Sequence, residues 1–189
     1  VTMALASLRG KVREYLSLTG AGLTALELDV KDENGEVAFI RPGVPLARRI
    51  GAADAYYNPR QAAKAAHASG VYLIGRIVVF EDPILSQSRP DMAIRRADGA
   101  VWTNAAGLGW TNPYDERVWD YNLDVAEAAV TAGFDEIMFD YVRFPTDGDV
   151  SSAVFAGKRG SKAAAIARFF QYARSRLEPR GWGVDLRAA

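Results

Sequence analysis

Four apolar runs of strand length recur along this 189-residue chain and alternate with helical patterns. The clearest run, VYLIGRIVVF, is β-branched and apolar on both faces, which is typical of a strand buried on both sides. Apolar residues at helical spacing, with capping residues before them and glycine or proline after them, mark the helices. The expected strands are 23–30, 71–80, 134–143 and 182–186, and the expected helices are 2–18, 58–70, 112–132 and 161–179. The order α-β-α-β-α-β-α-β predicts an α/β protein with a parallel sheet.

Two parallel architectures fit this order. The chain opens on a helix and closes on a strand, which favours one domain over 1–189 that is an incomplete (β/α) TIM-barrel segment, truncated at both ends, with about four strands and four helices. An eight-stranded barrel typically needs about 250 residues, more than this chain has. A doubly wound open sheet is the alternative, but no Gly-x-Gly-x-x-Gly or Walker pattern follows any strand. The barrel segment is the preferred prediction.

Composition narrows the classes of partner. Lysine plus arginine equals aspartate plus glutamate at 23 each, so no net field recruits nucleic acid or an anionic membrane. No apolar run is long enough to span a bilayer, and no signal-peptide pattern is present. The chain begins with Val1, which suggests processing from a longer protein, so the compartment stays open, as does the oligomeric state. With no cysteine and one histidine, no metal or cofactor is expected.

Acidic residues recur where the expected strands end. They are Asp29, Glu81, Asp82, Asp140 and Asp185. In a barrel these strand ends converge on one mouth, so the carboxylates would become neighbours. Paired carboxylates cleave glycosidic bonds, one as acid and the other as nucleophile or base. The alternative for any one of them is that it caps the next loop or helix.

The segment 133–145, GFDEIMFDYVRFP, is the most informative part of the sequence. It predicts a buried strand that ends in an acid, two aromatics and an arginine, and a buried charge is costly unless it is paired. Asp140 is therefore the first candidate catalytic residue, with Asp29 and Asp185 as candidate partners. Tyr141 and Arg143 are expected to orient it.

The expected substrate-binding residues surround this acid. They are Arg76, Glu81, Asp82, Trp102, Trp110, Tyr141, Arg143 and Phe144. Flat aromatic faces in long loops suit stacking against a sugar ring, although core packing explains any one of them alone. Arg76 lies near the middle of its strand and is expected either to pair with Glu27 on the neighbouring strand, supporting the floor of the site, or to reach the rim.

Several motifs also resemble a known family. They are LDVKD at 28–32, GRIVVFEDP at 75–83, DGAVW at 98–102, WTNPY at 110–114, WDYN at 119–122 and the block 134–145. The chain resembles a bacterial glycoside hydrolase-like domain long catalogued as a domain of unknown function, a TIM-barrel group related to α-amylase-like and α-galactosidase-like hydrolases. The resemblance implies a carbohydrate substrate, a secreted or cell-envelope location, and Asp140 in the place of the nucleophile.

The chain departs from this family pattern at two places. Met138 stands where a glutamine is expected, and in related barrels the general acid comes from a later strand, which puts it outside this segment. A non-catalytic carbohydrate-binding or envelope-scaffold module on a degenerate barrel is therefore the second hypothesis. A metal-dependent aldolase or isomerase is the third. A second carboxylate facing Asp140 would favour the hydrolase over the binding module.

Overall fold

A four-stranded parallel sheet forms the centre of the molecule. The computed structural model describes residues 1–40 and 43–178 and the backbone of 185–188. The strands are β1 (Ala25–Lys31), β2 (Tyr72–Val78), β3 (Glu136–Asp140) and β4 (Asp185–Ala188), and they lie in the order β1-β2-β3-β4. Neighbours in this sheet are also neighbours along the chain. The described strands therefore lack the reversal of order that marks a doubly wound sheet, and the open-sheet alternative loses its support.

Seven α-helices and three short 3-10 turns lie in the described residues. The helices are α1 (Met3–Ser7), α2 (Lys11–Leu16), α3 (Pro45–Arg49), α4 (Pro59–Ala68), α5 (Pro83–Ser88), α6 (Glu116–Ala132) and α7 (Lys162–Leu177), and the turns are η1 (Ser17–Ala21), η2 (Pro90–Met92) and η3 (Val150–Ser152). The expected single helix over 2–18 is wrong, because Gly10 has φ 81° and separates α1 from α2. The expected helix start at Asn112 is also wrong, because Asp115 caps α6 by accepting a hydrogen bond from the Arg117 N–H.

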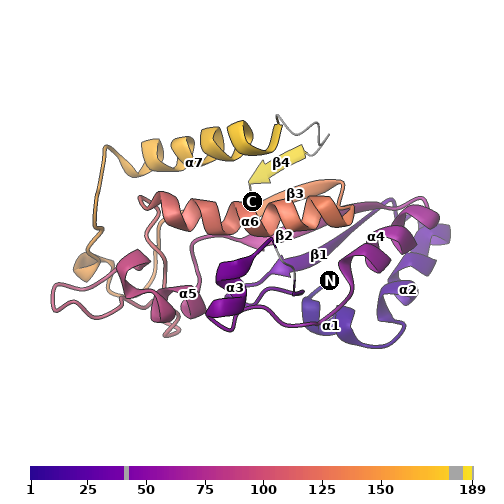
Figure 1. Ribbon diagram of the computed structural model, residues 1–189, viewed down its shortest axis with the longest axis horizontal. Helices are drawn as coiled ribbons and strands as arrows, with labels where there is room; N and C mark the ends of the chain where they lie inside the picture. The colour runs from indigo at the N-terminus through magenta and orange to yellow at the C-terminus, as the bar shows by residue number, and fades with distance from the viewer. Residues whose placement is uncertain (41–42, 179–184, 189) are drawn as a thin grey trace.

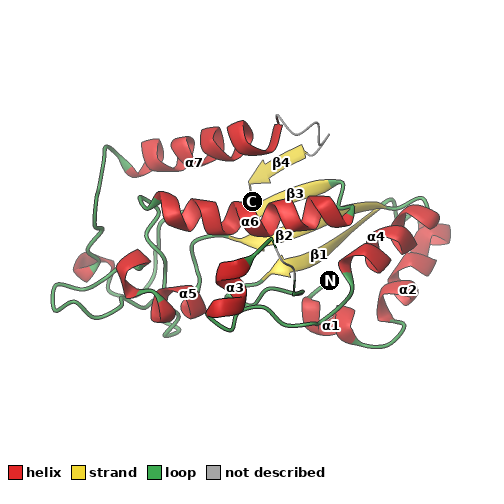
Figure 2. Ribbon diagram, viewed as in Figure 1, coloured by secondary structure: helices red, strands yellow, loops and turns green. Residues whose placement is uncertain are grey.

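Helices α4 and α6 pack on one face of the sheet, and α7 runs beside α6 and near β4 (Figure 1). Helix α6 contacts all of β1, β2 and β3, so it is the central element of the helical layer. Figure 2 shows the longest loops gathered beyond the carboxyl ends of the strands. In parallel α/β folds this is the end at which ligands bind.

Aromatic packing joins α7 to the sheet. Phe169 on α7 is completely buried, and its ring lies 5.4 Å from that of Phe139 on β3 and 5.6 Å from that of Phe80. Two side chains that pack closely against the backbone explain Gly75 in the middle of β2. A Cβ at this position would lie 2.9 Å from the ring of Phe134 and 3.0 Å from Val30, so only glycine fits without a shift.

The connection between β2 and α6 is compact. Isolated β-bridges join Glu81 to Trp110, Ala93 to Thr111 and Thr103 to Gly109, so this stretch folds back on itself as irregular antiparallel pairs. These pairs satisfy backbone groups that a free loop would leave to solvent. The loop layer therefore presents a fixed surface to the carboxyl ends of the strands.

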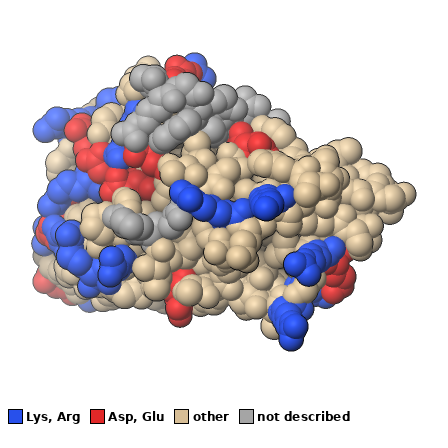
Figure 3. Space-filling model, turned by 45° about the vertical axis from the view of Figure 1, so that its right-hand side comes forward, with Lys and Arg blue, Asp and Glu red and all other residues tan. Residues whose placement is uncertain are grey.

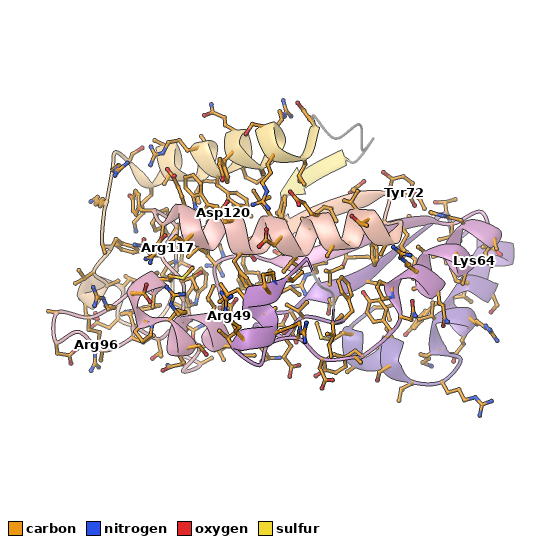
Figure 4. The ribbon with its side chains drawn as sticks, in the orientation of Figure 1. Arg49, Lys64, Tyr72, Arg96, Arg117 and Asp120 are labelled. Atoms are coloured by element: carbon orange, nitrogen blue, oxygen red, sulfur yellow. The ribbon has the colours of Figure 1, made fainter. Side chains whose placement is uncertain are left out.

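Charge is mixed over the surface. On the face drawn in Figure 3, acidic side chains gather toward one end with basic ones among and around them, and much of the rest is uncharged. In Figure 4, Asp120 on α6 lies on the side toward α7, and Arg117 lies at the beginning of the same helix. Within the described part of the chain, no helix is long and apolar enough to cross a membrane.

Candidate active site

One guanidinium group joins the strand-end acids. Arg76 on β2 donates from Nε to Oδ2 of Asp140 at 2.8 Å and from Nη1 to Oδ1 of Asp29 at 3.1 Å, and its Nη2 lies 2.8 Å from the same Oδ2 of Asp140. Its Nη1 also lies 3.4 Å from Oε2 of Glu33. The strand register explains this junction, because Asp29 lies opposite Arg76 while Asp140 lies opposite Val78, two residues further along β2. Side chains two residues apart share a face, so all three groups point to the same side of the sheet.

The expected pairing of Arg76 with Glu27 is wrong. Glu27 lies opposite Ile74, one same-face position before Asp29, and the guanidinium extends toward the carboxyl ends of the strands rather than sideways. The long side chain follows the direction of its strand and reaches the acids at the strand ends. Arg76 therefore supports the mouth itself.

Burial and the Arg76 guanidinium shift the pKa of Asp29 in opposite directions. Burial raises the pKa of Asp29 above its ordinary value, and the hydrogen bond from Arg76 offsets part of that rise. For Arg76, burial lowers the pKa, but the hydrogen bonds that it donates to Asp140 and Asp29 outweigh this effect and leave the net pKa raised. Arg76 stays positively charged, and burial makes the ionised form of Asp29 costly.

The backbone is strained directly after Asp140. Tyr141 has φ 52°, the one non-glycine residue with positive φ in the described part of the chain. Its N–H donates to Oδ1 of Asp140 at 2.7 Å, so both oxygens of this carboxylate accept hydrogen bonds. A non-glycine residue held in this region costs of order 1–3 kcal/mol and is found preferentially at functional sites. Strand β3 ends at Asp140, directly before this strained residue.

A layer of aromatic rings and one guanidinium covers this turn. The Arg143 guanidinium lies 4.9 Å from the ring centroid of Tyr141 and 5.1 Å from that of Trp110, and these two rings are 6.2 Å apart. Such cation–π contacts contribute about 0.5–1 kcal/mol at exposed sites. Arg143, which was expected to orient Asp140, is exposed and packs against these two rings instead.

A further carboxyl, that of Glu81, lies just beyond the end of β2. Its side chain is buried, with the residue 5% exposed, and its Oε2 accepts a hydrogen bond from Asn104 Nδ2 at 3.1 Å. Burial raises the pKa of Glu81, Asp147 and Glu33 raise it further by repulsion, and Arg143 lowers it. Glu81 is thus a buried acid whose pKa is affected by Glu33, the same residue whose carboxylate lies 3.4 Å from Arg76.

A fully buried ion pair lies beneath this mouth. Lys31 Nζ is 2.9 Å from Oδ2 of Asp82 and donates to the Val78 carbonyl at 2.6 Å, and neither charged side chain has any exposed area. Asp82 also caps α5 by accepting from the Leu85 N–H at 2.8 Å. The expectation that Asp82 binds substrate is therefore wrong, since it has no surface to offer. Sequence reasoning missed Lys31, which a regular strand would have placed on the face of Asp29.

The family model described as "putative glycosyl hydrolase domain" matches residues 1–187. The chain belongs to this family. The resemblance noted in the sequence is thus confirmed. No curated protein matches the chain.

Solved structures place this glycosyl hydrolase-family domain among known folds. A hypothetical protein from Ruminiclostridium thermocellum is 34% identical with a TM-score of 0.90, covering 100% of this chain and 95% of its own. An α-galactosidase from Lactobacillus brevis (14% identity, TM-score 0.64, 94% of this chain) and an α-amylase from Lactobacillus plantarum (17% identity, TM-score 0.64, 100% of this chain) share the fold. The chain spans 24% of the α-galactosidase and 43% of the α-amylase.

The aromatic residues expected to stack on sugar are mostly buried in this family member. Trp102 is 1% exposed and donates from Nε1 to the Asp149 carbonyl at 2.8 Å, Trp110 is 0% exposed, and Phe144 packs against Tyr114 with ring centroids 5.4 Å apart. The two tryptophans therefore form the core of the loop layer. The expectation that they stack on sugar is wrong, because neither ring has a free face. Their indole rings fill the space that the antiparallel bridges enclose.

The backbone of Asp185 is not at the carboxyl end of a strand. Its backbone lies at the beginning of β4, opposite Glu136 at the beginning of β3, four residues before Asp140. The expected strand, 182–186, ended near this residue, whereas β4 begins there. The backbone of Asp185 therefore lies at the amino end of the strands rather than at their carboxyl end. The side chain of Asp185 lies outside the described residues. Its proposed partnership with Asp140 therefore stays a prediction.

No group of three or more histidine, cysteine, aspartate or glutamate side chains in the described ranges is arranged to hold a metal ion. Asp32, one of the acids of the first mouth loop, instead accepts from the N–H groups of Asn34 and Glu36, both at 3.0 Å. It stabilises the turn at Asn34-Gly35. This is the capping alternative that was open for each strand-end acid.

Proposed function

We propose that this protein is a glycoside hydrolase that acts on a polysaccharide or oligosaccharide, and that its four strands are consecutive strands of a (β/α) barrel. Two observations support the barrel: the strands are parallel and sequential, and helices α4 and α6 pack on one face of the sheet. The other face carries the side chains of Arg76, Asp29 and Asp140 at the carboxyl ends of the strands. In characterised TIM-barrel enzymes this end carries the active site.

The single observation that carries the proposal is the junction of Asp140 and Asp29 on one guanidinium. Two carboxylates bound to one cation lie close together, as a glycosidase site requires. Asp140 accepts two N–H hydrogen bonds, one on each oxygen, and has an ion-pair contact with Nη2 of Arg76, which suits a nucleophile or charge stabiliser held in a fixed orientation. Arg76 orients it from below, and Tyr141 fixes it from the side.

One observation favours the second candidate, a non-catalytic carbohydrate-binding or scaffold module. Both oxygens of Asp140 already have donors, and a carboxylate held in this way can be purely structural. In that case the molecule would bind sugar at the same mouth without cleaving it.

The test uses the full-length protein and Asp140→Asn, which keeps the shape of the side chain. The proposal expects wild-type turnover of at least one substrate in a panel of bacterial polysaccharides and α-linked galacto- and gluco-oligosaccharides. Asp140→Asn should lower kcat by at least about a hundred-fold, since losing a group that acts directly in the chemistry costs about 10²–10⁴ or more. The matched control is Asp54→Asn on an exposed loop, which should leave kcat unchanged. Unchanged turnover by Asp140→Asn would remove this residue from the mechanism, and binding without turnover by the wild type would favour the module.

A further inference from the structure

We propose that Glu81 is the proton donor of this site, working with Asp140 on the same glycosidic bond; this rests on the proposed function. In the first step the Glu81 proton moves to the glycosidic oxygen, which keeps the electron pair of the breaking C1–O bond, while the Asp140 carboxylate bonds to C1. In the second step water attacks C1, gives a proton to the Glu81 carboxylate and releases Asp140. The two steps together consume one water and restore both side chains.

The first argument is that the other acids after the strands are occupied. Asp29 and Asp140 bind Arg76, and Asp82 binds Lys31. Glu33 also contacts Arg76, and its side chain is 46% exposed. Within the described part of the chain, Glu81 and Asp32 are the buried acids there without an ion pair, and Asp32 is engaged by the N–H groups of Asn34 and Glu36. A carboxyl without a bound cation can take up a proton without breaking a salt bridge.

The second argument is the way in which Asn104 holds Glu81. The Asn104 Oδ1 accepts from the N–H groups of Ala106 at 3.0 Å and Leu108 at 2.9 Å, so its amide nitrogen must face Glu81. That nitrogen donates to Oε2 of Glu81. An amide donor fits a neutral carboxylic acid through its carbonyl oxygen as well as it fits a carboxylate.

The third argument is that Glu81 is rigidly placed. A β-bridge joins it to Trp110, and the next residue, Asp82, donates its backbone N–H to the Gly109 carbonyl at 3.1 Å. Residue 81 follows β2, the strand directly beside the one that ends in Asp140. The ring of Trp110, the bridge partner of Glu81, lies 6.2 Å from that of Tyr141, the residue directly after Asp140, so both carboxyls flank the same pair of rings. Burial of this acid, which raises its pKa, suits a group that must stay protonated until the bond breaks.

The experiment compares two kinds of substrate, because a good leaving group needs no proton. The full-length wild type, Glu81→Gln and Asp140→Asn are assayed on α-galactosyl and α-glucosyl fluoride and on melibiose and maltotetraose. Glu81→Gln should lose about 10²–10⁴-fold in kcat/KM on the oligosaccharides and less than about tenfold on the fluorides, since general acid catalysis supplies about that much. It should also lose the basic limb of the pH profile. Asp140→Asn should lose activity on both kinds of substrate. The matched control is Glu116→Gln at the exposed start of α6, which should change neither.

The outcomes separate this inference from the proposed function. An unchanged Glu81→Gln, or equal losses on fluorides and oligosaccharides, overturns the role of Glu81 while leaving the hydrolase in place. A wild type that cleaves neither kind of substrate overturns both. If Glu81→Gln does not fold, titration of the isotope-labelled Glu81 carboxyl in the wild type decides, because a pKa at or below that of an ordinary glutamate is incompatible with a proton donor.

Discussion

Lys31 and Asp82 form an ion pair whose two side chains are both 0% exposed, with Nζ 2.9 Å from Oδ2. The pair joins the end of β1 to the first residues after β2, and the Lys31 ammonium also lies 5.7 Å from the ring centroid of Tyr121 on α6. It therefore connects two strands and the central helix directly beneath Glu81. Removing one charge would leave the other buried and unpaired.

We predict that Lys31→Met and Asp82→Asn each lower the free energy of unfolding by about 3–5 kcal/mol, the usual cost of breaking a buried pair. The double variant should lose clearly less than the sum of the two, because no buried charge is then left unpaired. Urea denaturation of all three variants measures this. Lys11→Met, which removes an exposed pair with Glu14, serves as the control and should change little. Additive losses would show that the two groups act independently.

Replacing Arg76 should affect stability in a pH-dependent way. Arg76→Met removes hydrogen bonds to two carboxylates, and charged hydrogen bonds contribute about 1.5–3 kcal/mol each, so a loss of about 3 kcal/mol is expected at neutral pH. The hydrogen bond from Arg76 lowers the pKa of Asp29, so its removal should raise that pKa further. The difference from wild type should therefore be full at neutral pH and shrink as the pH falls and Asp29 becomes protonated.

The measurement is urea denaturation of wild type and Arg76→Met at several pH values. Arg76→Lys should recover only part of the stability, because an ammonium group cannot donate to Asp29 and Asp140 in the planar geometry of a guanidinium. A difference between wild type and Arg76→Met that stays constant with pH would mean that Arg76 acts through packing alone.

The buried Glu81 predicts a second pH effect of the opposite sign. Because the pKa of Glu81 is raised in the folded state, the native protein binds this proton more tightly than the unfolded chain does. Ionised Glu81 therefore lowers stability as the pH rises through its native pKa. Glu81→Gln should be more stable than wild type at neutral pH, and this advantage should vanish at lower pH, where Glu81 is neutral. Thermal unfolding from about pH 4 to about pH 8 tests this, and an advantage that grows toward low pH would contradict it.

Arg176 should hold α7 against α6. Its guanidinium donates to three acids along one side of α6, namely Asp120 at 3.0 Å, Glu127 at 2.8 Å and Asp124. Burial raises the pKa of Asp124, and Arg176 opposes that rise. Arg176→Met should lower the free energy of unfolding by about 1–2 kcal/mol, since partly exposed pairs contribute up to about 1 kcal/mol each. Chemical denaturation at low and high salt measures the loss, which should be smaller at high salt. An equal loss from Arg174→Met, whose pair with Glu178 is exposed, would argue against a specific network.

The sequence predicted the alternation of helices and strands and the two acids that bind Arg76. Both follow from local patterns, since Asp29 and Asp140 each end an apolar run of strand length. It did not predict the ends of the elements, where single residues decide. Tyr141 ends β3 with a positive φ that its side chain does not announce, and Asp115 rather than Asn112 caps α6.

The other errors concern contacts between distant segments. The burial of Trp102 and Trp110 depends on how residues 81–111 pair with themselves, and loop pairing of this kind leaves no periodic signal. The contact of Glu81 with Asn104 depends on the same pairing. The backbone of Asp185 was misplaced because β4 is short. An error of a few residues in its predicted bounds moves this acid from one end of the strand to the other.

The register of β1 against β2 shifts between Asp29 and Lys31, where one extra residue on β1 lies against β2. This irregularity lets two charged residues only two positions apart serve opposite surfaces, with Asp29 in the mouth and Lys31 under α6. In a regular register with Val30 retained, Lys31 would lie opposite Val78, its ammonium group would turn toward the guanidinium of Arg76, and Asp82 would lose its counter-charge.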